Sequence, residues 1–148
     1  MLETQFATEL SKLSAGNKLG ELKNVYRKVL YSGGLIWLLI LVVFVFFSKE
    51  LVFFVLGENY TAYSKLLILI WFIQGSVFLY KVKNVLIRNL GDNRILLLSY
   101  ALGSLMSIFG SYLLIESMNV VGAAFTLLIS AVTIYMVLTV YWFFVRAK

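Results

Sequence analysis

Three cations follow one of the apolar runs of this chain, and they are its best candidates for binding a phosphate group. Lys81, Lys83 and Arg88 come after the run that ends at Tyr80. Point charges near a helix end suit phosphate. The alternative is that these cations only mark the side of a membrane on which the connection lies and touch lipid head groups there. The residues alone leave both interpretations open.

An uncharged polar side chain, Gln74, lies in the middle of an apolar run. Together with Gly75 and Ser76 it would be unfavourable against hydrocarbon. We therefore expect this stretch to face other helices or a polar cavity. A hydrogen bond to a neighbouring helix and contact with a ligand inside a cavity are the two roles open to Gln74.

Residue types that usually carry catalysis or hold metals are scarce. Cysteine and histidine are absent from the 148 residues, which excludes thiol nucleophiles, imidazole proton transfer and the usual zinc ligands. The seven acidic residues all lie outside the apolar runs, so paired carboxylates and a magnesium site have no material. We expect no enzyme activity, no metal and no cofactor.

The composition indicates that most of the chain lies in a membrane. Hydrophobic residues make up 61% and charged residues 14%, and the mean hydropathy is +0.93. A helix needs roughly 20 apolar residues to cross the hydrocarbon layer. The sequence therefore predicts an all-α, polytopic membrane protein with four transmembrane helices within residues 29–148. The expected spans are 29–47, 62–80, 95–115 and 120–145.

The distribution of lysine and arginine predicts the orientation of these spans. Of the 13 basic residues, all but Lys49 and Lys65 lie before residue 29, in the connection at 81–94 or after residue 145. Cytoplasmic loops collect lysine and arginine, so we expect both termini in the cytoplasm. A net charge of +6 would otherwise raise nucleic-acid binding. Because the loops explain this charge, the expected partner is membrane lipid and not nucleic acid.

Residues 1–28 precede the first span and read as a short amphipathic cytoplasmic helical segment. Phe6, Leu10 and Leu13 recur at helical spacing, and a second apolar stripe continues toward Tyr26. The segment either lies with its basic face on anionic lipid or links preceding helices to the first span.

Small residues recur at helical intervals in the last two expected spans. A spacing of four residues lets helix backbones approach closely, so we expect these stripes to serve helix packing. The residues are Ser99, Gly103 and Ser107 in one span and Gly122, Thr126 and Ser130 in the next.

Four short segments follow one another along the chain, at 6–13, 56–60, 89–94 and 121–124. Taken in order, they resemble the last third of the polysaccharide and O-antigen flippases in the multidrug/oligosaccharidyl-lipid/polysaccharide exporter superfamily. The turns of that family read L-F-G-x-x-Y, A-L-G-K-x-K and G-x-x-G-A-A-I-A, and its cytoplasmic connection reads F-P-x-L-S-x-L. This chain departs from that connection by having Ala7 in place of the proline.

The resemblance implies movement of an undecaprenyl-pyrophosphate-linked oligosaccharide across a bacterial plasma membrane. It also implies that the chain is the C-terminal portion of such a transporter, with the missing N-terminal helices as partners. Lys81, Lys83 and Arg88 would then attract the pyrophosphate of the substrate, and Gln74 would touch its glycan.

Two other classes of protein fit the same residues. A small four-helix accessory protein of polysaccharide glucosylation, of the GtrA-like type, matches the length and the basic loops. A structural subunit of an envelope synthesis complex, without transport activity, matches the small-residue stripes and the lack of charge inside the spans.

Overall fold

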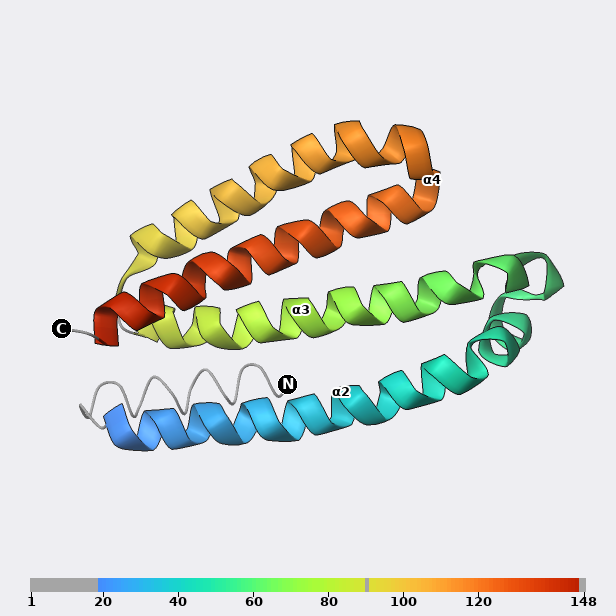
Figure 1. Ribbon diagram of the computed structural model, residues 1–148. Coiled ribbons are helices and arrows are strands. Elements are labelled where there is room, and N and C mark those ends of the chain that lie inside the picture. The colour runs from blue at the N-terminus through green and yellow to red at the C-terminus, as the bar shows by residue number, and fades with distance from the viewer. Residues whose placement is uncertain (1–18, 90, 147–148) are drawn as a thin grey trace.

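The computed structural model describes residues 19–89 and 91–146, and these residues form long helices (Figure 1). Only Gly57, Gly91 and Asp92 among them are not helical, so the described part of the chain contains no strand. The elements are α2 (Leu19–Leu56), η1 (Glu58–Tyr63), α3 (Ser64–Asn89) and α4 (Asn93–Arg146). The expected motif at 6–13 lies outside the described residues.

The first helix, α2, is longer than the span expected at 29–47 and has a bend. It already begins at Leu19 and continues to Leu56, with non-helical angles at Phe47 (φ −119°, ψ 17°). The expected end of the span therefore coincides with the bend. Beyond Phe47 the helix leaves its earlier axis (Figure 1). Gly57 then turns the chain with a φ of 91°, a conformation that glycine adopts without a steric penalty.

The pairing of α2 with α3 depends on two indoles and a glycine. The indole N–H of Trp37 donates to the carbonyl of Trp71 at 3.0 Å, and that of Trp71 donates to the carbonyl of Trp37 at 2.9 Å. Gly75 leaves room for this arrangement, because a Cβ atom there would lie 2.6 Å from the Trp37 ring. The indole of Trp37 also packs edge-on against Phe72.

The last helix, α4, folds back on itself at Asn119. The backbone angles of this residue (φ 50°, ψ −126°) interrupt the helix, and Figure 1 shows the two arms lying side by side. Small residues bring the arms together: a Cβ atom at Gly103 would lie 2.6 Å from Ile134, and one at Gly110 would lie 3.1 Å from Thr126. The sequence predicted two separate spans over this part of the chain.

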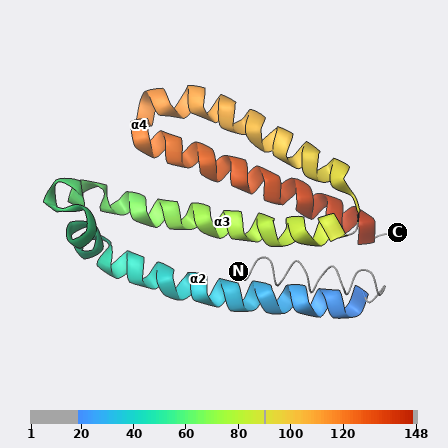
Figure 2. The same cartoon turned by 180° about the vertical axis from the view of Figure 1, so that it is seen from behind.

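The helices run back and forth between two sides of the molecule. The described residues begin and end on the same side of the molecule as the connection at Gly91, whereas η1 and Asn119 lie on the other side (Figures 1 and 2). Helix α3 contacts both α2 and α4. A small cluster of apolar side chains joins α3 to α4 near the end with the termini: Ile87, Leu96, Ile134 and Leu138.

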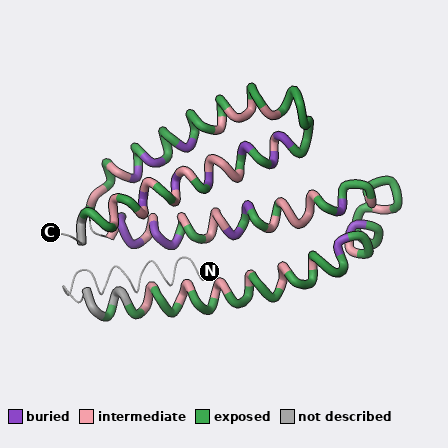
Figure 3. Tube along the Cα trace, in the orientation of Figure 1, coloured by how far each residue is buried: buried purple, intermediate pink, exposed green. Residues whose placement is uncertain are grey.

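Most of the apolar surface faces outward, which fits a lipid environment. Three helices of the described chain are long and apolar enough to cross a membrane. Figure 3 shows that exposed and intermediate residues make up nearly all of α2. In water such a continuous apolar surface would be unfavourable, since soluble monomers rarely expose large apolar patches.

Candidate functional site

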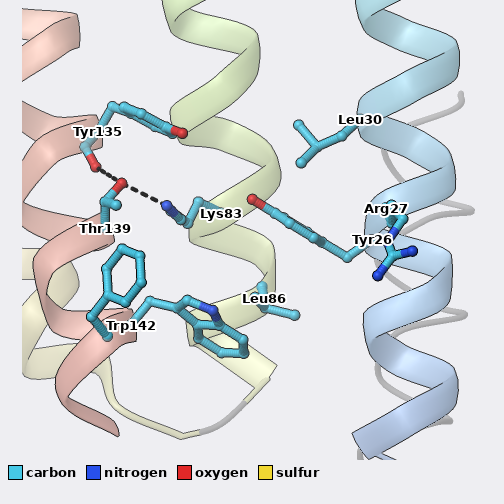
Figure 4. Close-up of a pocket in the computed structure, with 9 residues that line it drawn as sticks. Tyr26, Arg27, Leu30, Lys83, Leu86, Tyr135, Thr139 and Trp142 are labelled. Atoms are coloured by element: carbon cyan, nitrogen blue, oxygen red, sulfur yellow. Dashed lines mark hydrogen bonds between the residues drawn. The ribbon is translucent and has the colours of Figure 1, made fainter. Parts of the chain in front are cut away.

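A pocket of about 320 Å³ lies between the first turns of α2, the second half of α3 and the last arm of α4. It is near the end of the fold that carries the described termini (Figure 4). Its walls combine two cations, two tyrosines and a threonine with apolar side chains. The lining residues are Tyr26, Arg27, Leu30, Lys83, Leu86, Tyr135, Thr139, Trp142 and Phe143.

Lys83 is the polar centre of this pocket. Its side chain is only 5% exposed, and its Nζ donates a hydrogen bond to Thr139 Oγ1 at 2.5 Å. The same Nζ lies 4.5 Å from the centre of the Tyr135 ring, a cation–π contact. The partners that the structure gives to this ammonium group, within the described residues, are thus a hydroxyl and a ring and not a carboxylate.

Thr139 links the lysine to the backbone of its own helix. Its hydroxyl accepts the hydrogen bond from Lys83 and donates one to the carbonyl of Tyr135 at 2.6 Å. Tyr135 and Thr139 are four residues apart, so they lie on one face of α4. This hydroxyl can hold the lysine in place, but it carries no charge to neutralise the ammonium group.

Helix α2 supplies the opposite wall. Tyr26 is half-buried and its hydroxyl points toward Lys83, while Arg27 beside it is exposed (Figure 4). Leu86 forms an apolar floor, is 1% exposed and packs with Tyr26 and Trp142. The pocket therefore has a cationic and hydroxyl-bearing side above an apolar base.

Lys83 lies near the C-terminal end of α3. It lies six residues before the last residue of the helix, Asn89. At a rise of 1.5 Å per residue this is about 9 Å from the helix end. A lysine at this distance from the end of a membrane-spanning helix can reach the phosphate layer of a bilayer while its stem stays in the hydrocarbon.

The structure does not bring the three predicted cations together. Lys83 is buried against α4, whereas Lys81 and Arg88 are exposed. Residues two apart on a helix point in nearly opposite directions, while residues seven apart share a face. Gln74 is exposed as well and precedes Lys81 by seven residues, so Gln74, Lys81 and Arg88 form one polar stripe along α3.

Four of the six small residues in the expected stripes lie between the arms of α4 or at their turn: Gly103, Gly122, Thr126 and Ser130. Ser99 is fully buried and its hydroxyl bonds to the carbonyl of Leu96 at 2.8 Å. Gly103 faces Ser130, and Thr126 faces Gly110. Gly122 is buried beside the carbonyl of Leu114, where a side chain would overlap the backbone. Ser107 is half-buried on the first arm.

A second polar contact lies at the connection between α3 and α4. The Tyr141 hydroxyl donates to the carboxylate of Asp92, which fastens the connection after α3 to the last arm of α4. Asn84 also donates to the Tyr100 hydroxyl at 2.5 Å. The described residues contain no group of three acidic, histidine or cysteine side chains that could hold a metal ion.

Sequence analysis did not single out Tyr135 and Thr139. The signal available was their spacing of four residues, a tyrosine and a threonine on one face of an apolar helix. Their partner Lys83 lies 56 positions before Thr139 along the chain, so only the fold brings it to them.

Comparisons with protein-family models, with curated proteins and with solved structures found no match to this chain. A buried cation that has no carboxylate partner among the described residues, in a pocket near a helix end, is suited to binding an anion.

Proposed function

We propose that this chain is part of a flippase that moves undecaprenyl-diphosphate-linked oligosaccharides from the cytoplasmic to the outer leaflet of a bacterial plasma membrane. The observation that carries the proposal is Lys83, a buried cation in an open pocket with no carboxylate partner among the described residues. Burying an unpaired charge costs free energy. A bound diphosphate would supply the missing negative charge. The resemblance of the segments at 56–60, 89–94 and 121–124 gives the substrate class.

In the proposed arrangement the chain crosses the membrane four times, with both termini in the cytoplasm. Two observations support this topology. The described ends lie on the same side as the connection at Gly91 (Figures 1 and 2), and basic residues are concentrated near these points. In addition, α4 would be about 80 Å long if straight, far more than the hydrocarbon thickness of about 30 Å.

The pocket can bind a diphosphate through residues from three directions. Lys83 and Arg27 would form charge-assisted hydrogen bonds with phosphate oxygens. The hydroxyl of Tyr26 would donate to a further phosphate oxygen, while Thr139 holds Lys83 in place. The apolar floor at Leu86 would contact the first part of the polyprenyl chain, which keeps the headgroup at the depth of Lys83.

The polar stripe on α3 supports the presence of further helices. Gln74 lies ten residues after the start of α3 and is exposed in the described chain, as are Lys81 and Arg88. A glutamine in mid-membrane is unfavourable against lipid. Helices of the same transporter outside this chain would cover the stripe and, together with it, enclose the glycan.

Lipid binding by the purified chain in nanodiscs tests the proposal. Native mass spectrometry should find a disaccharide-linked undecaprenyl diphosphate bound in preference to phosphatidylglycerol. Lys83→Met should weaken this binding about tenfold or more, because hydrogen bonds to charged groups contribute about 1.5–3 kcal/mol. The matched control is Lys81→Met, which removes an exposed lysine two residues away and should change affinity less than about threefold.

The opposite results would reject the proposed site or the proposed function. A loss of lipid binding with Lys81→Met and none with Lys83→Met would mean that the polar stripe, and not the Lys83 pocket, binds the diphosphate. Equal binding of both lipids by the unaltered chain would favour the accessory or structural protein considered above.

A further inference from the structure

The bend of α2 borders a shallow, open hollow at the end of the fold opposite to the described termini. After Phe47 the helix changes direction (Figure 1), and residues 48–56 run beside η1. We call residues 48–63 the outer elbow. Residues of the elbow and of the end of the preceding helix line this open hollow of about 750 Å³. The lining residues are Val43, Phe47, Lys49, Glu50, Leu51, Phe53, Phe54 and Thr61.

The elbow exposes large apolar side chains that water would not favour. Phe54 is 89% exposed and Val55 is 72% exposed. Burying apolar surface stabilises a protein by roughly 25 cal/mol per Å². Contact of these side chains with water is therefore unfavourable. The two charged residues of the hollow, Lys49 and Glu50, are adjacent in sequence and exposed.

The elbow is too short to cross a membrane and lies where an interface is expected. Residues 51–56 are six apolar residues, against roughly 20 for a span. Tyr60 and Tyr63 of η1 are half exposed, and tyrosine is enriched at membrane–water interfaces. Large apolar side chains are also exposed on α2 before the bend, where Phe46 is 73% exposed.

We propose that the outer elbow lies in the membrane interface and that its hollow binds an acyl chain of a bilayer phospholipid. The apolar wall accounts for the chain, since each buried methylene contributes about 0.8 kcal/mol. Lys49 accounts for the other part of the lipid, because an exposed ammonium group beside the hollow can reach its phosphate. This site is separate from the Lys83 pocket and does not depend on transport.

Spin labels can locate the elbow, since the chain contains no cysteine that would need to be removed. Single labels at Phe54→Cys and Asn59→Cys are compared in phosphatidylcholine–phosphatidylglycerol vesicles. The label at position 54 should be accessible to oxygen and shielded from a water-soluble nickel complex, and the label at position 59 should show the reverse. Access of the nickel complex to position 54 equal to that at position 59 would overturn the interfacial location.

Filling the hollow tests the lipid site itself. Val43→Trp introduces an indole at a position that lines the hollow. Val42→Trp introduces one at the adjacent position, which is not part of the lining. Electron spin resonance of chain-labelled phosphatidylcholine measures the number of motionally restricted lipids per protein. Val43→Trp should lower this number and Val42→Trp should leave it unchanged. Equal numbers in the two variants would contradict a specific acyl-chain site.

Discussion

Leucine in place of Gly75 is expected to separate α2 from α3. A Cβ atom at this position would lie 2.6 Å from two atoms of the Trp37 ring, and leucine adds three further carbons. The ring cannot yield easily, because its N–H donates to the carbonyl of Trp71 and the ring packs edge-on against Phe72. Overpacking costs about 1–3 kcal/mol, and the lost hydrogen bond adds about 0.6 kcal/mol in a membrane. We expect the free energy of unfolding to fall by about 2–4 kcal/mol.

Gly34→Leu is the matched control for this substitution. Gly34 belongs to the same helix pair, but a Cβ atom there would meet nothing within 4 Å. Unfolding in mixed micelles titrated with sodium dodecyl sulfate, followed by tryptophan emission, measures both variants. If Gly34→Leu lowered stability as much as Gly75→Leu, close contact at Gly75 would not be the cause.

A disulfide between positions 110 and 126 should form almost completely in the folded chain. The Cβ atom of a residue at 110 would lie 3.5 Å from the Cβ of Thr126, and disulfides need a separation of about 3.5–4.5 Å. In a straight helix the same two residues, 16 positions apart, would be about 24 Å from each other. Since the chain has no cysteine of its own, Gly110→Cys combined with Thr126→Cys reports directly on the fold-back of α4.

The control pair keeps the first cysteine and moves the second by one residue. Leu127 is 56% exposed and follows Thr126 on the same arm, so Gly110→Cys with Leu127→Cys should oxidise slowly. Counting free thiols by mass spectrometry of the monomer after mild oxidation gives the yield. Equal yields for the two pairs, or none for either, would mean that the arms do not pack as described.

The helical class of the protein could be predicted from the apolar runs, but the helix ends could not. An apolar run bounded by charged residues predicts where hydrocarbon can surround a helix. The helix itself continues wherever its backbone N–H and C=O groups find hydrogen-bond partners. This is why α2 begins at Leu19 and not at Val29. The fold-back at Asn119 falls between two expected spans, because the short polar stretch 116–119 divided them.

The candidate site shows a different limit of sequence analysis. Helical geometry alone puts Lys83 on the opposite side of α3 from Lys81 and Arg88. Which side is covered depends on α2 and α4, and no local pattern gives their positions. Lys81, Lys83 and Arg88 belong to one basic stretch of the sequence, but the helix directs Lys83 to a different side from the other two. The hydroxyl of Thr139 and the ring of Tyr135 then decide that Lys83 is the buried one.

The central claim is that the chain crosses the membrane four times, with the Lys83 pocket on the cytoplasmic side. Single cysteines at Asn59, Asn93 and Ser117, all exposed residues, can be labelled with a membrane-impermeant maleimide in spheroplasts and again after lysis. The proposed topology predicts labelling of positions 59 and 117 in intact spheroplasts and of position 93 only after lysis. Labelling of position 93 in intact spheroplasts, or failure of position 117 to react in both states, would contradict it.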